Sequence, residues 1–319
     1  MALSPIRMLP AYRYGDATPW GGSMLHTLFG RLLPDSRTGE SLEISAIDAL
    51  NSRDEQGRPL SDLIGLYGER LTGRGLASPF PLLLKLIDAR DRLSVQVHPD
   101  DAYAQKHEHK LGKTEAWIIL YAEEGAQLVY GVRENVTKEA LMNGALQGAA
   151  VEKLLRFVPV KAGDVFYIPA GTVHAIGRGI VLYEIQQSSD VTYRFYDWDR
   201  TDAQGKKREL HLKKALDVTD TEKRLDAVSP RSLPLSGTGE RLLLLSSPFF
   251  TVERYKNCQR ASLAPVGVCR LATALKKTTL AWADGVLTLH PGDSALLPAD
   301  GYPLTLSSGD VLMSQPIAW

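Results

Sequence analysis

The sequence predicts a mainly β protein, an antiparallel sandwich or barrel interrupted by short helices. Two observations support this class. Glycine (27) and proline (18) are spread along the 319 residues, and the apolar stretches between them are short. Many short apolar runs bounded by turn residues are typical of antiparallel β folds. The runs occupy residues 93–98, 116–121, 163–170, 180–187, 251–255 and 293–299.

Helices are expected in two of the intervening segments. Residues 61–73 read SDLIGLYGERLTG, so we expect a helix that begins with Ser61 as its N-cap and stops at the closing glycine. Residues 137–157 have helical character as well. Gly144 and Gly148 lie inside this segment and are expected to split it into shorter helices.

A division of the chain is expected near residues 200–240. The composition becomes charged and polar there, with a short helix expected at 211–218 and a loop or linker at 228–240. The β pattern resumes from Arg241. The expected parts are residues 1–200, 201–240 and 241–319.

A weak internal repeat relates the first and third parts. The motif Gly-x5-Pro-x-Gly at residues 163–171 recurs as Gly-x5-Pro-x-Asp at residues 292–300, each time as a predicted strand that leads into a turn. Two copies predict two related β units. The first copy presents His174 three places after its turn, and the second copy has no such histidine. We therefore expect a metal only in the first unit.

Charge and cysteine content narrow the functional classes. The 37 basic and 37 acidic residues balance, which argues against nonspecific binding to nucleic acid or to an anionic membrane surface. Cys258 and Cys269 lack the close spacing of a zinc or redox pair and suit a reducing compartment. The N-terminal residues have no continuous apolar run, and no stretch approaches the roughly 20 apolar residues that span a bilayer. A cytoplasmic location is expected.

A polar face within a valine-rich strand is the first sign of a metal site. Because side chains alternate along a strand, Gln96 and His98 share one face and the flanking valines take the other. Unpaired polar groups inside a barrel are costly, and imidazole and amide oxygen are both acceptable ligands for a divalent ion. Glu115 begins the next apolar run and His174 follows the Pro-Ala-Gly turn. These strand-borne groups could converge on one ion.

The spacing around His174 resembles the second signature of cupins, small β-barrels that bind a metal. The pattern departs at Arg178, where asparagine is usual, and Gln96 replaces the first histidine of the first cupin signature. Longer stretches are similar to type I mannose-6-phosphate isomerase in its short bacterial form. The similar stretches are residues 19–22, 80–104, 112–120, 163–177, 183–198, 208–218 and 247–255.

This resemblance implies two cupin-type (jelly-roll) β-barrels with short helical insertions. The first would be catalytic and metal-binding, and the second degenerate and without metal. The resemblance implies one Zn²⁺ per chain and a small sugar phosphate as substrate, with no nucleic-acid or membrane partner, in a monomer or weak homo-oligomer. The implied zinc ligands are Gln96, His98, Glu115 and His174. The implied catalytic or substrate-binding residues are Arg194, Lys113 and Glu184.

Interconversion of mannose 6-phosphate and fructose 6-phosphate needs a proton moved between C1 and C2, through an enediol with developing negative charge on oxygen. Zinc would act as Lewis acid or template, and Arg194 would add a fixed positive charge. The base stays open between Glu184, whose apolar strand would raise its pKa, Lys113, and metal-bound water. Lys113, Arg178 and Arg200 are the candidate phosphate ligands.

Two other functions are alternatives to the isomerase. An iron-dependent cupin oxygenase usually offers two or three histidines, and an amide ligand with only two histidines favours a redox-inactive metal. A non-enzymatic sugar-phosphate-binding cupin would have no need of Arg194, Lys113 and Glu184 together. Leu42 stands where the family usually has tryptophan, and we expect it to alter packing without loss of activity.

Overall fold

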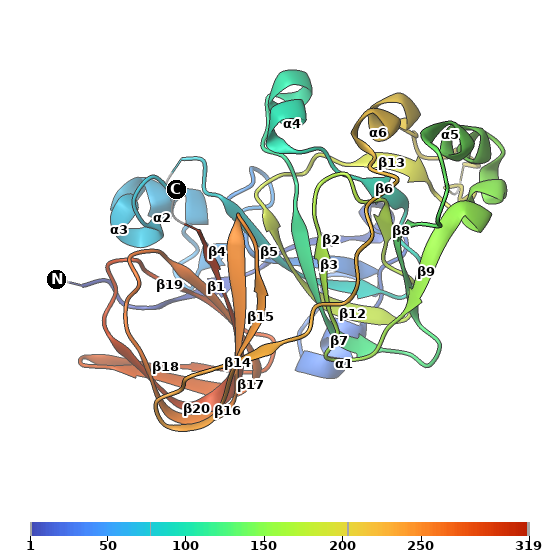
Figure 1. Cartoon of the computed structure of the whole chain (residues 1–319). Coiled ribbons are helices and arrows are strands. Elements are labelled where there is room, and N and C mark those ends of the chain that lie inside the picture. Colours follow the sequence, from blue (N-terminus) through green and yellow to red (C-terminus); the bar gives the residue numbers. More distant parts are fainter. Residues whose placement is uncertain (1, 77, 203, 318–319) are drawn as a thin grey trace.

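Three antiparallel sheets form the core of the computed structural model, which describes residues 2–76, 78–202 and 204–317 (Figure 1). The six-stranded sheet has the order β10 (Val165–Ile168), β7 (Glu115–Ala122), β12 (Ile180–Gln187), β5 (Leu82–Ala89), β3 (Thr38–Ile44) and β2 (Ala11–Tyr14). The five-stranded sheet has the order β13 (Tyr193–Tyr196), β6 (Val95–Val97), β11 (His174–Ala175), β8 (Gln127–Val132) and β9 (Leu155–Pro159).

The third sheet has nine strands and contains the C-terminal part of the chain. Its order is β14 (Arg231–Leu233), β15 (Thr238–Ser246), β16 (Phe250–Leu263), β20 (Leu304–Pro316), β17 (Arg270–Trp282), β19 (Ser294–Leu297), β1 (Ile6–Leu9) and β4 (Arg53–Asp54), and β18 (Gly285–Leu289) pairs with β17. In the described residues, the six- and five-stranded sheets are open paths with two edge strands each, and the nine-stranded sheet is an open path from which β18 branches at β17. The predicted mainly β, antiparallel class is confirmed.

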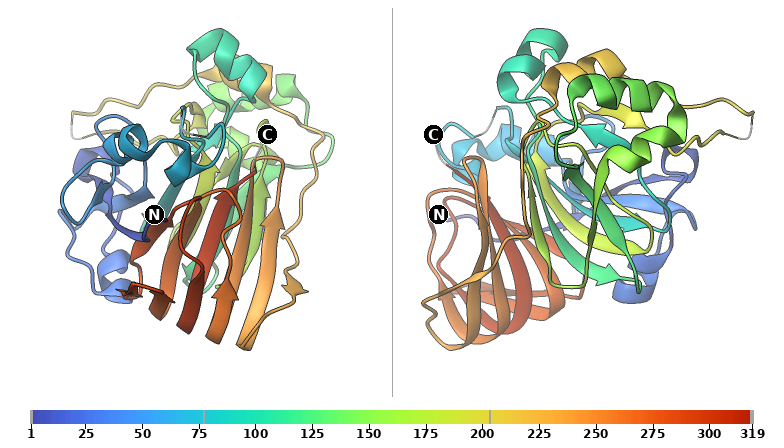
Figure 2. Two further views of the ribbon diagram at one scale, coloured as in Figure 1. Left: turned by 90° about the vertical axis from the view of Figure 1, so that its left-hand side faces the viewer. Right: turned by 45° about the vertical axis from the view of Figure 1, so that its right-hand side comes forward.

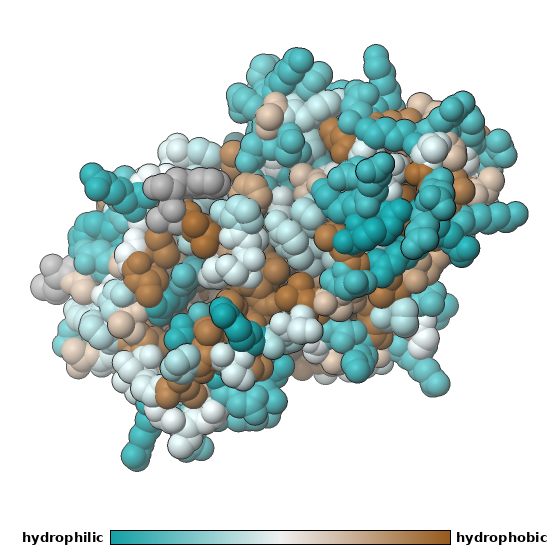
Figure 3. Space-filling view, in the orientation of Figure 1, coloured by the Kyte–Doolittle hydropathy of each residue, from teal (hydrophilic) through white to brown (hydrophobic). Residues whose placement is uncertain are grey.

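The helices are short and lie between strands. They are η1 (Gly15–Ala17), α1 (Met24–Phe29), α2 (Leu60–Tyr67), α3 (Glu69–Thr72), α4 (Asp101–Glu108), α5 (Lys138–Leu146), η2 (Gly148–Leu154) and α6 (Leu212–Val218). The views in Figure 2 show the nine-stranded sheet as a separate layer, with α4, α5 and α6 at the opposite end of the molecule. Within the described ranges, every helix is too short or too polar to cross a membrane. Polar side chains cover much of the face around these three helices (Figure 3).

The first expected helix differs at its start. It begins at Leu60 with Pro59 as the N-cap, so the prediction of Ser61 as N-cap is wrong. The amide of Leu60 donates instead to the carbonyl of Ser52, and the amide of Ser61 to the side chain of Asn51, so these first-turn donors need no serine cap. Gly68 divides the segment into α2 and α3, and the predicted stop at residue 73 is confirmed.

The second expected helix is split at one of its two glycines. Gly148, with φ of +64°, separates α5 from η2, as predicted. Gly144 lies inside α5 and does not break it. A Cβ atom at Gly144 would lie 3.0 Å from a methyl of Leu154 and 3.2 Å from Cα of Val151, so the glycine allows α5 and η2 to pack closely.

The segment expected as a linker contains strands. Residues 228–240 contain β14, which pairs with residues 241–243 of β15, and β15 itself begins at Thr238 rather than at Arg241. The expected helix at 211–218 is confirmed as α6. Strands β1 and β4 lie in the expected first part of the chain yet belong to the C-terminal sheet. Backbone pairing with a distant segment, which local composition does not report, decides this placement.

Three apolar interfaces hold the layers together. One face of the six-stranded sheet packs on the nine-stranded sheet, for example through Tyr183 and Leu312. The other face packs on the five-stranded sheet through residues such as Trp117 and Tyr130. The outer face of the five-stranded sheet is covered by α5, η2 and α6. The space between the six- and five-stranded sheets is where the polar residues of the site are buried.

Candidate metal centre and adjoining cavity

The side chains of strand β6 alternate between its two faces, as the sequence predicts. Val95 and Val97 are fully buried in the core under α5 and α6, and Gln96 between them points the other way and lines a cavity. His98 follows directly after the strand and is buried. The polar face predicted for this strand therefore lies between the two facing sheets.

The Pro-x-Gly turn brings His174 beside this strand. His174 opens β11, where it pairs with Gln96 on one side and Tyr130 on the other. Gly171 in the turn has φ of +85°, and its amide donates to the carbonyl of His98 at 2.9 Å. The centroids of the two imidazole rings, His98 and His174, are 4.7 Å apart.

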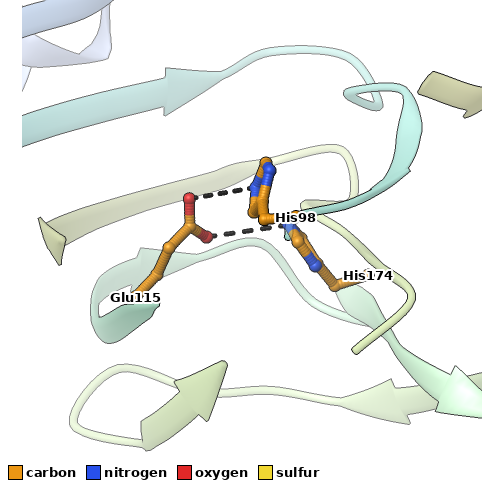
Figure 4. Close-up of side chains that lie close together, drawn as sticks. All are labelled: His98, Glu115 and His174. Atoms are coloured by element: carbon orange, nitrogen blue, oxygen red, sulfur yellow. Dashed lines mark ion pairs between the residues drawn. The ribbon is translucent and has the colours of Figure 1, made fainter. Parts of the chain in front are cut away.

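Glu115 approaches from the facing sheet as the first residue of β7. Its Oε1 lies 3.3 Å from Nε2 of His98 and its Oε2 lies 3.6 Å from Nε2 of His174. Figure 4 shows the carboxylate facing both imidazoles. All three side chains are about 1% exposed, and they form the one cluster of three metal-ligating groups found in the described ranges.

The tautomers and the unpaired atoms fit a metal ion. Nδ1 of His98 lies 2.9 Å from the carbonyl of Val191, and Nδ1 of His174 lies 2.8 Å from that of Thr172. Donation from each Nδ1–H leaves the Nε2 lone pair free toward Glu115. Nε2 of His98 and Oε2 of Glu115 are buried without a hydrogen-bond partner among the described residues, and Oε1 of Glu115 faces Nζ of Lys113. Such atoms are costly without a cation.

The electrostatics favour the protonation states that ligands need. Burial lowers the pKa of His98 to about 3 and also lowers the pKa of His174, so both imidazoles are neutral. Burial alone would raise the pKa of Glu115, but the positive charge of Lys113 holds it well below its usual range. Donor separations of 3.3 and 3.6 Å suit an ion with ligands at about 2.0–2.1 Å in tetrahedral geometry, which requires roughly 3.3 Å.

Gln96, the fourth predicted ligand, lies at the edge of the cluster formed by His98, Glu115 and His174. Its amide nitrogen lies 3.4 Å from Nε2 of His174, and its amide oxygen is 3.4 Å from the hydroxyl of Ser94. A half-turn of the amide exchanges the two atoms and presents oxygen to the cluster. The structure thus brings all four predicted ligands together.

A cavity of about 220 Å³ adjoins this cluster. Gln96 and Glu115 line it, together with the three predicted catalytic residues Lys113, Glu184 and Arg194. Further lining residues include Arg13, Glu40, Lys85, Asp190 and Arg208. The wall is thus dominated by charged side chains.

Glu184 lies at the centre of β12 with a fixed carboxylate. In the register it is opposite Lys85 on β5 and Trp117 on β7. Its Oε2 accepts a hydrogen bond from the indole Nε1 of Trp117 at 2.7 Å, and its Oε1 lies 3.2 Å from Nζ of Lys85. Burial raises the pKa of Glu184, and the negative charge of Glu115 raises it further.

Lys113 and Arg194 reach the cavity from different elements. Nζ of Lys113 is buried and lies 2.8 Å from Oε1 of Glu115. Arg194 lies on β13 directly opposite Gln96. Its Nη1 donates to the carbonyl of Glu209 at 2.9 Å, while its Nε is buried without a partner among the described residues.

Two of the three expected phosphate ligands lie away from this cavity. Arg178 lines a separate hollow of about 210 Å³ beside Trp198. Arg200 lines another hollow, of about 540 Å³, and pairs with Asp91 at 3.8 Å. Of the three, only Lys113 lines the cavity beside the metal cluster. The prediction that Arg178 and Arg200 bind the substrate phosphate is therefore wrong for the cavity beside the metal cluster.

Sequence reasoning missed Lys85, Glu40 and Arg208. A usable signal existed for Lys85, because a lysine inside the eight-residue buried run of β5 requires a partner. Lys85 lies 3.6 Å from Glu40 as well as 3.2 Å from Glu184. Arg208 follows a charged segment that offers no distinguishing pattern.

Comparisons with known proteins point to one family of enzymes. Residues 18–126 match the family model described as phosphomannose isomerase type I, catalytic domain. The mannose-6-phosphate isomerase of Streptococcus mutans is 43% identical over 286 residues, which cover 88% of each chain. Mannose-6-phosphate isomerase ManA of Bacillus subtilis is 37% identical over 307 residues, 93% of this chain and 94% of that protein.

Solved structures give the same result for the fold. The crystal structure of the mannose 6-phosphate isomerase from Bacillus subtilis superposes with a TM-score of 0.90 at 31% identity, over 99% of this chain and 100% of that chain. The phosphomannose isomerase of Salmonella typhimurium superposes with a TM-score of 0.79 at 16% identity, which shows the fold alone. This chain therefore belongs, as an enzyme, to the type I phosphomannose isomerase family.

Proposed function

We propose that this chain is a zinc-dependent aldose–ketose isomerase that interconverts mannose 6-phosphate and fructose 6-phosphate. One observation carries the proposal beyond family membership. Two buried donor atoms that lack a hydrogen-bond partner among the described residues, Nε2 of His98 and Oε2 of Glu115, lie beside a cavity that also receives the buried carboxylate of Glu184. Ligands for a Lewis acid and a candidate base thus adjoin the same space.

A zinc ion held by Gln96, His98, Glu115 and His174 would polarise and orient the oxygen atoms of the substrate. Arg194 adds a fixed positive charge next to Gln96, where it stabilises negative charge that develops on those oxygens. One preorganised donor of this kind is worth on the order of 3 kcal/mol. Fixed charges in a buried site need no reorganisation during the reaction.

Glu184 is the base that we favour for proton movement between C1 and C2. Its carboxylate is oriented by Trp117 and Lys85, and its raised pKa brings it closer to the range in which a group can both take and return a proton. Lys113 is the competing candidate. Its Nζ is engaged with Glu115 at 2.8 Å, so it is better placed to hold that ligand than to remove a proton.

We also propose how the sheets correspond to the two expected barrels. The six- and five-stranded sheets, which face each other across the cavity, would form the catalytic cupin-type jelly roll, and the nine-stranded sheet would be the degenerate second unit. The repeat supports this. Both copies consist of a glycine with positive φ (Gly163 and Gly292), a four-residue strand and a proline turn. The proposed parts remain residues 1–200, 201–240 and 241–319, with β1 and β4 added to the last.

The test is a coupled assay of mannose 6-phosphate isomerisation on chelated protein and again after zinc is restored. We expect activity to fall on chelation and to return with zinc. Absence of activity in both samples would reject the isomerase and favour a sugar-phosphate-binding protein. Iron-dependent oxygen uptake would instead support an oxygenase.

A further inference from the structure

We propose that Arg208 binds the phosphate group of the substrate in the cavity that it lines together with Arg194, beside the metal cluster. This inference rests on the proposed function, because it names the residues that recognise one part of the proposed substrate. No sequence pattern points to Arg208. The position of its guanidinium group in the cavity wall is what assigns it this role.

Arg194 has no direct ion pair within the described residues. No carboxylate lies within 4.0 Å of its guanidinium in that part of the chain, and its one hydrogen bond from the side chain goes to the carbonyl of Glu209. Its Nε is buried without a partner there. Burial lowers the pKa of Arg194 and the positive charge of Arg208 lowers it further, while Asp197 and Glu209 act in the opposite direction. A half-buried cation without a direct carboxylate partner favours an anionic ligand.

Arg208 is oriented so that part of its guanidinium stays free. Its Nε and Nη2 donate to the two carboxylate oxygens of Asp197 at 2.8 and 2.5 Å. Asp197 is itself 5% exposed, so this bidentate pair fixes the guanidinium rigidly. Nη1 makes no hydrogen bond with the residues that the structure describes. Arg208 lines the same cavity as Arg194, with this nitrogen to spare.

The other cations of the cavity are already committed. Lys113 lies 2.8 Å from Glu115, Lys85 lies 3.2 Å from Glu184, and Arg13 lies 3.4 Å from Glu40. Each of these positive charges is opposed by a carboxylate. Among the described residues, the only carboxylate within 4.0 Å of Arg194 or Arg208 is that of Asp197, which Arg200 also approaches, so Arg208 keeps free N–H groups beside other cations. Phosphate oxygens match the free edge of a planar guanidinium.

The test compares R208K with wild-type protein, with R200Q as the matched control. Arg208→Lys keeps a positive charge beside Asp197, so the buried carboxylate retains a partner and the fold is protected. Lysine lacks the planar fork and loses the spare N–H next to Arg194. Arg200 also lies within 4.0 Å of Asp197, and both arginines line the hollow of about 540 Å³, but only Arg208 also lines the cavity beside the metal cluster. Each variant is checked for bound zinc before kinetics.

The readouts are KM and kcat for mannose 6-phosphate and the inhibition constant of inorganic phosphate. We expect R208K to raise KM about 10- to 100-fold and to weaken phosphate inhibition by a similar factor, as expected for the loss of a hydrogen bond to a charged group. Its kcat should stay within about threefold of wild type. R200Q should change each constant by less than about twofold.

The second variant, Arg208→Gln, removes the charge and should weaken phosphate inhibition further. If R208Q does not fold, R208K alone decides. Unchanged values of KM and of phosphate inhibition in R208K would overturn the inference. A fall in kcat without a change in phosphate inhibition would also overturn it, because that result indicates a structural role for Arg208. A wild-type protein that does not isomerise mannose 6-phosphate would instead reject the proposed function. An active wild type with an unaffected R208K rejects this inference only.

Discussion

The amide of Gly171 donates a hydrogen bond to the carbonyl of His98, so the turn that delivers one histidine of the metal cluster is tied to the other. The two residues are 73 positions apart in sequence. Gly171 needs φ of +85° to make this contact, and a Cβ at this position would lie 3.0 Å from the carbonyl oxygen of Val218. The position of His174 therefore depends on a glycine three residues earlier.

Gly171→Ala is expected to destabilise the fold by about 1–2 kcal/mol, from a strained backbone, and to lower zinc occupancy as well. Gly163→Ala is the matched control, because Gly163 has φ of +97° but open space where a Cβ would be. The control should lose stability without losing zinc. Thermal unfolding and metal analysis of both variants check this. Equal zinc content in the two variants would contradict the dependence of His174 on its turn.

His174→Ala should lose bound zinc and turnover together, because Nε2 of His174 is a donor that no neighbouring side chain replaces. Arg194→Ala should keep zinc and lose on the order of 100-fold in kcat, because Arg194 contacts no ligand atom of the cluster. Metal analysis and steady-state kinetics on both variants separate the two roles. Stoichiometric zinc in H174A would mean that the ligand set is wrong.

The sequence alone predicted the parts of the site that depend on local rules. Alternation along residues 95–98 separated Gln96 and His98 from the valines, and the glycine-proline turn located His174. These signals work because strand period and turn chemistry are properties of neighbouring residues. The resemblance to a family supplied the roles of Arg194, Lys113 and Glu184, and the structure brings all three to one cavity.

What the sequence could not give depends on pairing between distant segments. The phosphate candidates Arg178 and Arg200 were chosen for their charge, and the fold directs them into other hollows. Arg208 was missed because its orientation comes from Asp197, on a segment that the fold brings alongside. Likewise β1 and β4 joined the C-terminal sheet through contacts that local composition does not encode.

Asp88 should make folding stability depend on pH. Burial raises its pKa from 3.8 to about 6, although its carboxylate accepts a hydrogen bond from the amide of Met24. In the folded state it therefore keeps a proton between about pH 4 and 6 that the unfolded chain releases. Its stabilising contribution is present below pH 4 and is lost as the pH rises through 6. Denaturant unfolding from pH 4 to 7 should show that the free energy of unfolding falls with pH more in the wild type than in D88N. Parallel profiles of unfolding free energy for the two proteins would reject this role of Asp88.

Glu184→Gln should lower kcat by about 10²- to 10⁴-fold and leave zinc in place, because the amide keeps the shape of the carboxylate but cannot take a proton. In the proposed mechanism the ionised form of Glu184 is the base, and its raised pKa means that this form appears only at a higher pH than for an ordinary glutamate. In wild-type protein kcat/KM should therefore rise with pH along an acidic limb displaced upward. That limb should be missing from E184Q and present in Lys113→Met. If K113M loses the acidic limb of the kcat/KM profile and E184Q keeps it, Lys113 is the base. The hydrogen bond from the indole of Trp117 then only holds the Glu184 carboxylate in a structural role.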